Sequence, residues 1–166
     1  MKLSSSPWGA VQHQNTIAPG MISVSTSGHG GIWLDDDRWQ RLLALFPGFK
    51  PYSGAAQWLE EDCEWALAAL AFPTEFTHQD VHAAVETAIH WLQWATIPAD
   101  AKAIRDTFHA TIADRWEIGS MGWGQSGSWF NARHVTTGES RYYRGDAPSG
   151  RFIAESDLST FQRVAA

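Results

Sequence analysis

A stripe of apolar side chains in the middle of the chain restricts the fold more than any other feature of the sequence. The stripe consists of Val81, Ala84, Val85, Ala88, Ile89, Leu92 and Ala95. Spacings of three and four residues place these side chains on one face of an α-helix, where they can be buried together. Shorter patterns of the same kind precede and follow it: Trp39, Leu42, Leu43 and Phe46; Leu59, Cys63, Ala66, Leu67 and Leu70; Ala101, Ile104, Phe108 and Ile112. The sequence therefore predicts a helical middle over residues 35–116.

The two ends of the chain have the pattern of β-strands. Residues 21–26 alternate apolar and polar side chains, and residues 128–143 have the pattern of a hairpin around a glycine-containing turn. Neither end supplies enough strands to bury a sheet face by itself. We therefore predict an α+β fold in one domain over 1–166. Strands from 8–34 and 128–155 would form a single antiparallel sheet, built from both chain ends and covered by three or four helices.

The composition limits the classes of function. The 166 residues carry a net charge of −6, with 18 acidic against 12 basic side chains. An acidic chain of this kind argues against direct binding of nucleic acid over its whole surface. It has a single cysteine, no apolar run of about 18 residues, and no apolar segment near its start that resembles a signal peptide. We therefore expect a soluble, cytoplasmic protein without an internal disulfide and without membrane contact.

A glycine-rich segment follows the predicted strand 21–26 and places His29 between Gly28 and Gly30. Glycines allow a ligand to approach the backbone closely, and a histidine on such a loop can act as a general base or as a ligand. The alternative is a tight turn that requires positive φ angles, with His29 hydrogen-bonded inside its own loop. Neither a P-loop nor a dinucleotide-binding fingerprint is present, because the glycines are not followed by the lysine or the helix that those motifs need.

Four carboxylates are concentrated at Glu60, Glu61, Asp62 and Glu64, around Cys63. Like charges this close repel one another, so a compensating interaction is expected. We predict that they lie at the start of a helix, where the helix dipole favours negative charge, with the three glutamates facing outward. The functional alternatives are a metal site, a general acid–base pair, and an acidic patch for a basic partner. Cys63 is predicted to be buried and unreactive, because neighbouring acids disfavour its thiolate.

Three histidines and one glutamate follow a spacing of four residues on the predicted central helix: His78, His82, Glu86 and His90. Two histidines at this spacing can chelate zinc, but structural zinc sites also use thiolates. The chain has only one cysteine. We expect a solvated polar edge here, and from the sequence we assign no metal ligand and no cofactor.

Three segments together are similar to a known family. They are 6–31, which contains Trp8-Gly9 and Ser27-Gly28-His29-Gly30-Gly31; 59–66, which contains Glu60-Glu61-Asp62; and 137–143. The chain resembles a domain of unknown function that recurs in accessory proteins of bacterial plasmids and phages, sometimes near anti-restriction genes. The resemblance implies that His29 and the acidic run belong to the family's pattern. The pattern has a tyrosine before the acidic run where this chain has Trp58-Leu59, which argues against hydroxyl chemistry there.

The leading hypothesis from the sequence is a phage or plasmid counter-defence protein, such as an anti-CRISPR or anti-restriction inhibitor. It would bind a host protein, a nucleic-acid-handling component of a defence system, through acidic and aromatic side chains. The expected binding residues are Trp8, His29, Asp36, Asp37, Glu60, Glu61 and Glu64.

The alternative is a small enzyme with a site made of His29 and a carboxylate. Its catalytic candidates are His29, Glu61 and Asp62. The two hypotheses differ in the surface they require. A flat acidic surface with exposed tryptophan favours the inhibitor, whereas a concave pocket that holds His29 and a carboxylate favours the enzyme.

Overall fold

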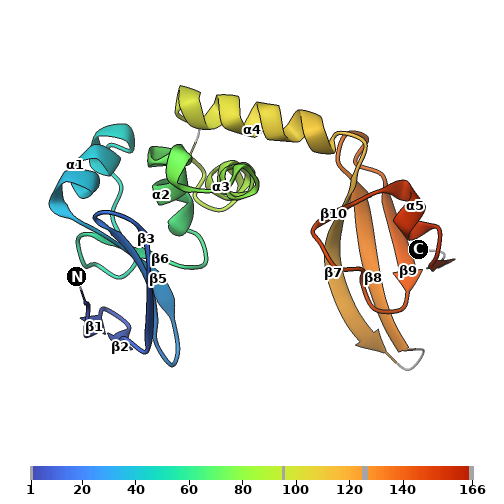
Figure 1. Cartoon of the computed structure of the whole chain (residues 1–166), viewed down its shortest axis with the longest axis horizontal. Helices are drawn as coiled ribbons and strands as arrows, with labels where there is room; N and C mark the ends of the chain where they lie inside the picture. Colours follow the sequence, from blue (N-terminus) through green and yellow to red (C-terminus); the bar gives the residue numbers. More distant parts are fainter. Residues whose placement is uncertain (1, 95, 125–126, 165–166) are drawn as a thin grey trace. The chain divides into compact units, whose positions relative to one another are not determined.

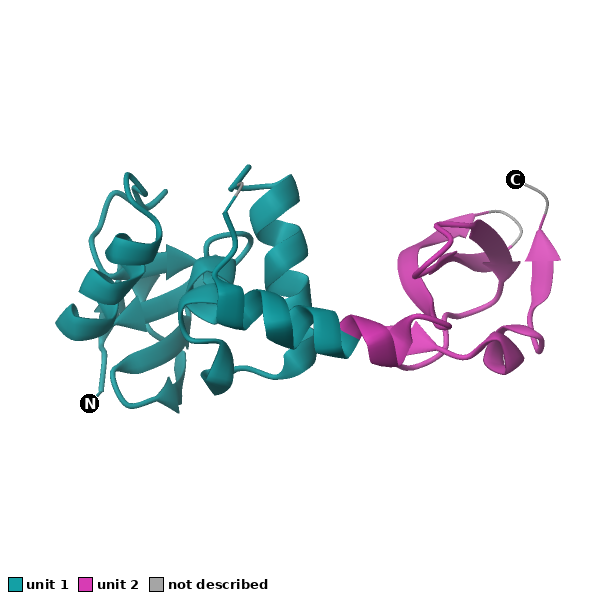
Figure 2. Cartoon of the chain, turned by 90° about the horizontal axis from the view of Figure 1, so that it is seen from above, with its two compact units in different colours: residues 1–108 teal, residues 109–166 magenta. Residues whose placement is uncertain are grey.

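The computed structural model describes residues 2–94, 96–124 and 127–164 and divides the chain into two compact units (Figure 1, Figure 2). Unit 1 comprises Met1–Phe108 and unit 2 comprises His109–Ala166. Each unit contains its own β-sheet and its own cluster of buried apolar side chains. Within the described ranges, every helix is too short or too polar to cross a membrane.

The main sheet of unit 1 has four antiparallel strands. Their order in the sheet is β3 (His13–Ala18), β4 (Met21–Ser25), β5 (Gly30–Leu34) and β6 (Trp58–Glu60). The predicted alternation over 21–26 forms β4, with Met21, Ile22 and Val24 buried. A short ribbon of β1 (Ser5–Ser6) and β2 (Gly9–Ala10) precedes this sheet. Helix α1 (Asp36–Leu45) lies between β5 and β6 in the chain.

Among the described residues, four further helical segments follow β6 before the next strand of the chain. They are α2 (Trp65–Ala71), the 3-10 turn η1 (Pro73–Glu75), α3 (His78–His90) and α4 (Ala99–Ile112), within which the boundary between the units falls. The Asp35 side chain caps α1 by accepting from Arg38 N–H (2.9 Å). Thr77 and Asp80 cap α3 with a reciprocal capping box. Residues 66–71 of α2 are all buried, so this helix is the centre of the core that α1, α3 and the sheet share.

Unit 2 is built on a five-stranded antiparallel sheet. Its strand order is β10 (Phe152–Ile153), β7 (Trp116–Gly124), β8 (Gly127–His134), β9 (Ser140–Arg144) and β11 (Gln162–Val164), with the short helix α5 (Glu155–Leu158). Its core contains Trp116, Phe130, Ala132, Tyr143, Ile153 and Leu158. The rings of Phe130 and Tyr143 stack with centroids 5.3 Å apart. Unit 2 therefore buries a sheet face with its own side chains.

The prediction of a single antiparallel sheet covered by helices is wrong, because the described strands form three separate sheets. Leu59 and Glu60, predicted to lie at the start of a helix, belong to β6, which completes the main sheet of unit 1. Residues 116–124, which connect the end of the predicted helical middle to the predicted strands of the second end, form β7 and complete the sheet of unit 2. With four and five strands, neither sheet needs the other to bury a face.

An ion-pair cluster makes the stability of unit 2 dependent on pH. Glu117 on β7 accepts hydrogen bonds from Arg151 Nη2 (2.7 Å) and from Arg133 Nη2 (3.0 Å). Burial disfavours ionisation of Glu117, but the hydrogen bonds and charges of Arg151 and Arg133 outweigh it. They hold the pKa of the carboxyl below its ordinary value.

We expect Glu117→Gln to destabilise unit 2 near neutral pH by about 1–2 kcal/mol, because it removes charge-assisted hydrogen bonds. A carboxyl whose pKa is lowered by folding adds stability above its unfolded pKa and loses it as the pH falls through its folded pKa. The effect should therefore shrink below about pH 4. Urea unfolding, followed at the indole signal of Trp116, measures the change in the free energy of unfolding. Asp146→Asn, an exposed carboxylate of the same unit, is the control. An effect of Glu117→Gln that is equal at neutral and acid pH would contradict this account.

Close packing at β5 gives a second prediction. A Cβ at Gly31 would meet the Leu59 carbonyl oxygen and the Trp8 ring, whereas a Cβ at Gly28 would face open space. We expect Gly31→Ala to destabilise unit 1 by about 1–3 kcal/mol through overpacking. The matched variant Gly28→Ala should change stability by less than about 0.5 kcal/mol. Thermal unfolding followed by circular dichroism compares them, and equal effects would show that the contact of Gly31 with Leu59 and Trp8 does not limit stability.

Candidate functional site

His29 lies on the turn between β4 and β5, and Thr26 holds the backbone of this turn. The Thr26 hydroxyl donates to the His29 carbonyl oxygen (2.7 Å) and accepts from the N–H groups of His29 (3.1 Å) and Gly28 (3.3 Å). The Thr26 N–H also donates to the His29 carbonyl oxygen (2.8 Å). These hydrogen bonds involve only the backbone of His29. The imidazole takes part in none of them, and 49% of the side chain is exposed.

Gly30 and Gly31 are required for space, and none of the three glycines around His29 is required for a positive φ angle. Gly28, Gly30 and Gly31 all lack a positive φ, so the interpretation based on such angles is wrong. A Cβ at Gly30 would meet the carboxylate of Glu61 and the carbonyl oxygen of Val24 (2.8 Å). The absent side chain therefore makes room for the acidic run beside the turn.

Glu60 is the last residue of β6, and Glu61, Asp62 and Glu64 lie in the turn between β6 and α2, not on the outer face of a helix. The pairing of β5 with β6 sets Gly31 opposite Glu60, which brings the acidic turn beside the histidine turn. Glu60 and Glu64 are only 6% and 5% exposed, whereas Glu61 and Asp62 are exposed. The prediction that three glutamates face outward is therefore wrong for two of them.

Glu60 has one bonded and one unbonded carboxylate oxygen in a buried position. Its Oε2 accepts from the N–H groups of Asp62 (2.8 Å) and Cys63 (3.2 Å). Its Oε1 has no hydrogen-bond partner and lies 3.7 Å from Nδ1 of His29, beyond hydrogen-bonding distance. Buried carboxylate oxygens are usually paired, because burying an unpaired charge is costly. This oxygen is therefore available to a cation.

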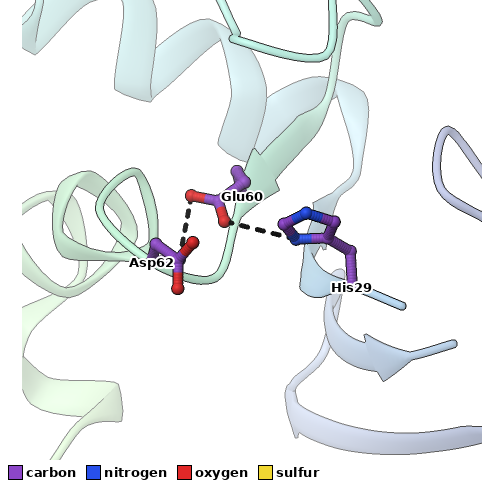
Figure 3. Close-up of side chains that lie close together, drawn as sticks. All are labelled: His29, Glu60 and Asp62. Atoms are coloured by element: carbon purple, nitrogen blue, oxygen red, sulfur yellow. Dashed lines mark hydrogen bonds and ion pairs between the residues drawn. The ribbon is translucent and has the colours of Figure 1, made fainter. Parts of the chain in front are cut away.

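His29, Glu60 and Asp62 form a compact group. One ligand atom from each lies within 4.8 Å of the other two, and among the described residues this is the one such group of potential metal ligands. Figure 3 shows Glu60 between His29 and Asp62, at the end of β6. Glu61 approaches the same imidazole, with its Oε1 3.7 Å from Nδ1 of His29. An imidazole and two carboxylates are ligands that divalent transition-metal ions accept.

Glu64 fastens the acidic turn to the loop that precedes β6. Its Oε1 accepts from the N–H of Tyr52 (2.6 Å) and its Oε2 accepts from the N–H of Glu60 (3.0 Å). Burial raises the pKa of Glu64 above its ordinary value, although the hydrogen bonds from Glu60 and Tyr52 favour the charged form. Since both of its oxygens are bonded to backbone, Glu64 positions Glu60.

Cys63 lies half-buried at the wall of the pocket described below, and not in the core as predicted. Burial raises the pKa of its thiol, and the charges of Glu60, Asp62 and Glu64 raise it further. The low reactivity expected from the sequence stays a prediction, and this direction of the pKa supports it.

The cluster lines a pocket of about 630 Å³ in unit 1. This volume lies within the range of small-molecule sites, about 300–1,000 Å³. One part of the pocket lining is polar and consists of His29, Lys50, Glu60, Asp62, Cys63 and Glu64. The other part is largely apolar and consists of Gly48, Phe49, Tyr52, Leu67, Leu92 and Trp94. A concave pocket that holds His29 and a carboxylate is the arrangement that favours an enzyme.

Four residues expected from the sequence do not line this pocket: Trp8, Asp36, Asp37 and Glu61, although Glu61 lies beside His29. Trp8 packs edge-on against Trp58, with ring centroids 5.8 Å apart. Asp36 and Asp37 are exposed in the first turn of α1, and Asp36 accepts a hydrogen bond from Gln57 Nε2 (2.6 Å). The structure therefore brings together His29, the acidic turn and no other residue of the predicted set.

The histidine stripe on α3 does not gather into a metal-ligand group within the described residues. His82 is buried and packs against Phe108, with ring centroids 5.6 Å apart. His90 Nε2 lies 3.3 Å from Glu86 Oε2. His78 is exposed at the start of the helix. The expected solvated edge is therefore wrong for His82.

No pattern in the sequence singles out Lys50, Phe49 or Trp94 as pocket residues. Phe49 and Lys50 follow the helix-ending pair Pro47-Gly48, and Trp94 follows the end of α3. Loops positioned by a rigid scaffold often carry binding residues, so the location of these three residues in predicted loops was the feature of the sequence that could have indicated them. Their convergence on one pocket depends on tertiary packing.

Residues 1–118 match the family model described as a domain of unknown function (DUF7007). The matched segment includes the entire pocket and the group of His29, Glu60 and Asp62, whereas the hairpin of β8 and β9 lies outside it. No curated protein and no solved structure matches the chain. The family description contains no activity, so a function must be argued from the geometry of the site.

We expect Glu60→Gln to stabilise the cation-free protein and Glu64→Gln to destabilise it. A glutamine at position 60 can keep its carbonyl oxygen on the N–H groups of Asp62 and Cys63 while removing an unpaired buried charge. A glutamine at position 64 must place its NH2 group against a backbone N–H donor. Thermal unfolding at neutral pH should show Tm changes of opposite sign, each equivalent to about 1–2 kcal/mol. Equal losses of stability would show that Glu60, like Glu64, has only a structural role.

Proposed function

We propose that this chain, which belongs to the DUF7007 family, is a small metal-dependent enzyme with its active site in the pocket of unit 1. In this proposal His29, Glu60 and Asp62 hold one divalent cation. The observation that carries it is the Oε1 oxygen of Glu60, which is buried, has no hydrogen bond and lies beside the other two side chains (Figure 3).

The energetics of Glu60 favour a cation over an empty site. A buried carboxylate with one unpaired oxygen costs on the order of a few kcal/mol. At 3.7 Å from Nδ1, His29 does not relieve this cost through a hydrogen bond. A divalent ion in direct contact, at about 2.0–2.2 Å, would offset it. A residue that is unfavourable in the free protein and favourable with a ligand is typical of a functional site.

The geometry requires a small movement on binding. Donor atoms around one ion lie about 3–4 Å apart when each bond is near 2.1 Å, and the three donors here lie within 4.8 Å of one another. His29 and Asp62 are exposed, whereas Glu60 is buried and held by two backbone N–H groups. The two exposed side chains can therefore close onto the fixed one.

The residues around the cluster provide the support that a metal site needs. The N–H groups of Asp62 and Cys63 orient the Glu60 carboxylate through its second oxygen. Glu61 Oε1 lies 3.7 Å from the same Nδ1 of His29 and adds a further negative charge beside the proposed ion. Three protein ligands leave coordination positions open, as in catalytic sites. A bound divalent ion would supply Lewis-acid chemistry or an activated water to a ligand in the pocket.

A partner-binding role in counter-defence, with the plasmid or phage context that it implies, is a second proposal. Its expected binding residues include three glutamates of the acidic run, and two of these, Glu60 and Glu64, are buried. The exposed pair Asp36 and Asp37 on α1 is the observation that favours it. The metal-dependent enzyme is the leading proposal, because the features of the pocket all point to one chemistry.

Isothermal titration calorimetry of chelator-stripped protein with ZnCl2 and with MnCl2 tests the proposed metal site. We expect wild type to bind one equivalent of at least one ion, and Glu60→Gln or His29→Ala to weaken binding by about 100-fold or more, because each removes a direct ligand. His78→Ala, which removes an exposed histidine outside the pocket, should bind as wild type does. The proposal is overturned if neither ion binds, or if binding survives Glu60→Gln unchanged.

A further inference from the structure

We infer that the pocket takes a ligand with an apolar body and one anionic oxygen group, and that this group is held between Lys50 and the cation. The inference rests on the proposed metal site and adds the substrate class of that site. Three features of the pocket carry it: a wall fixed by the core, a lysine without an ion pair, and the balance of charge.

The apolar wall is preformed. The ring of Phe49 packs edge-on against Trp39, with centroids 6.2 Å apart, and the ring of Trp94 packs edge-on against Phe46 at 5.4 Å. Trp39 and Phe46 are themselves buried, and Leu67 of α2 lines the pocket from the core. Because the core holds these side chains in place before any ligand binds, an apolar body gains contact without an ordering cost.

Lys50 is the one lysine or arginine among the described residues of the pocket lining. It is exposed and forms no ion pair with another described residue within 4 Å. The loop that carries it is fastened on both sides. The Phe49 N–H donates to the Phe46 carbonyl oxygen (3.2 Å), and the Tyr52 N–H donates to Glu64 (2.6 Å). The backbone at Lys50 is therefore held beside the pocket, and the ammonium group has no carboxylate of the described residues within ion-pair distance.

The balance of charge admits an anionic group only once the cation is bound. The lining contains three carboxylates, on Glu60, Asp62 and Glu64. Without an ion they repel an anion, whereas a divalent ion and Lys50 together offset all three. Two cationic centres then face the same space, which is the arrangement that holds a carboxylate or phosphate by both ends. An organic cation would instead compete with the ion for the free oxygen of Glu60.

Three probes of similar size and different charge test the inference: phenylacetate, 2-phenylethanol and 2-phenylethylamine. Their binding is followed at the indole N–H signal of Trp94 in ¹H–¹⁵N spectra, assigned with Trp94→Phe. Zinc affinity is measured first and separately, so a failure of the metal site is distinguished from a failure of this inference. With zinc bound, we expect phenylacetate to bind at least about tenfold more tightly than the alcohol, and to lose this preference when a chelator removes the zinc.

Lys50→Met should weaken phenylacetate by about fivefold or more while leaving the affinities for zinc and for the alcohol unchanged. Lys102→Met, which removes an exposed lysine of α4 outside the pocket, is the matched control and should bind phenylacetate as wild type does. If zinc binds but the three probes bind alike, or Lys50→Met has no effect, the inference is wrong and the metal site stands. Preferential binding of the amine to zinc-free protein would overturn it in favour of an organic cation.

Discussion

The antiparallel pairing of β5 with β6 is the interaction on which the rest of unit 1 depends. It sets Gly31 opposite Glu60 and Ile32 opposite Leu59, and so joins two segments that are separated in the chain by α1 and a loop. Leu59 enters the core with α2, while Glu60, one residue later, reaches the turn that carries His29. The pairing is close because Gly31 has no side chain to hold the strands apart. One register therefore builds both the core and the site.

The helices of the middle region were predictable from the sequence, whereas β1, β6, β7 and β11 lie outside the predicted strand regions. The helical spacings over 35–116 identify the apolar faces of α1, α3 and α4, because burial on one face requires that period. β6 has only three residues, too few to show alternation, and Leu59 also fits the helical spacing of α2. β7 contains glycines that are unfavourable in most strands. Here Gly119 and Gly122 lie beneath the side chains of Asn131 and Trp129, which occupy the space that their own side chains would need.

The site was predictable in its residue types and not in its roles. Glycines around a histidine and a run of acids indicated chemistry, and the structure joins them in one pocket. Burial divides the acids in a way that local sequence does not reveal. Glu64 uses both oxygens on backbone N–H groups, whereas Glu60 keeps one oxygen free. In the proposed site, this difference between Glu60, at the end of β6, and Glu64, in the turn after it, distinguishes the ligand from the residue that positions it.

A crystal structure of the protein with zinc, using diffraction data collected above the zinc absorption edge, tests the central claim most directly. The account predicts one strong anomalous peak in the pocket of unit 1. It should lie about 2.0–2.2 Å from Oε1 of Glu60, with His29 and Asp62 as further ligands. A zinc ion bound elsewhere in the molecule, with Oε1 of Glu60 hydrogen-bonded to His29 in a metal-free pocket, would contradict it.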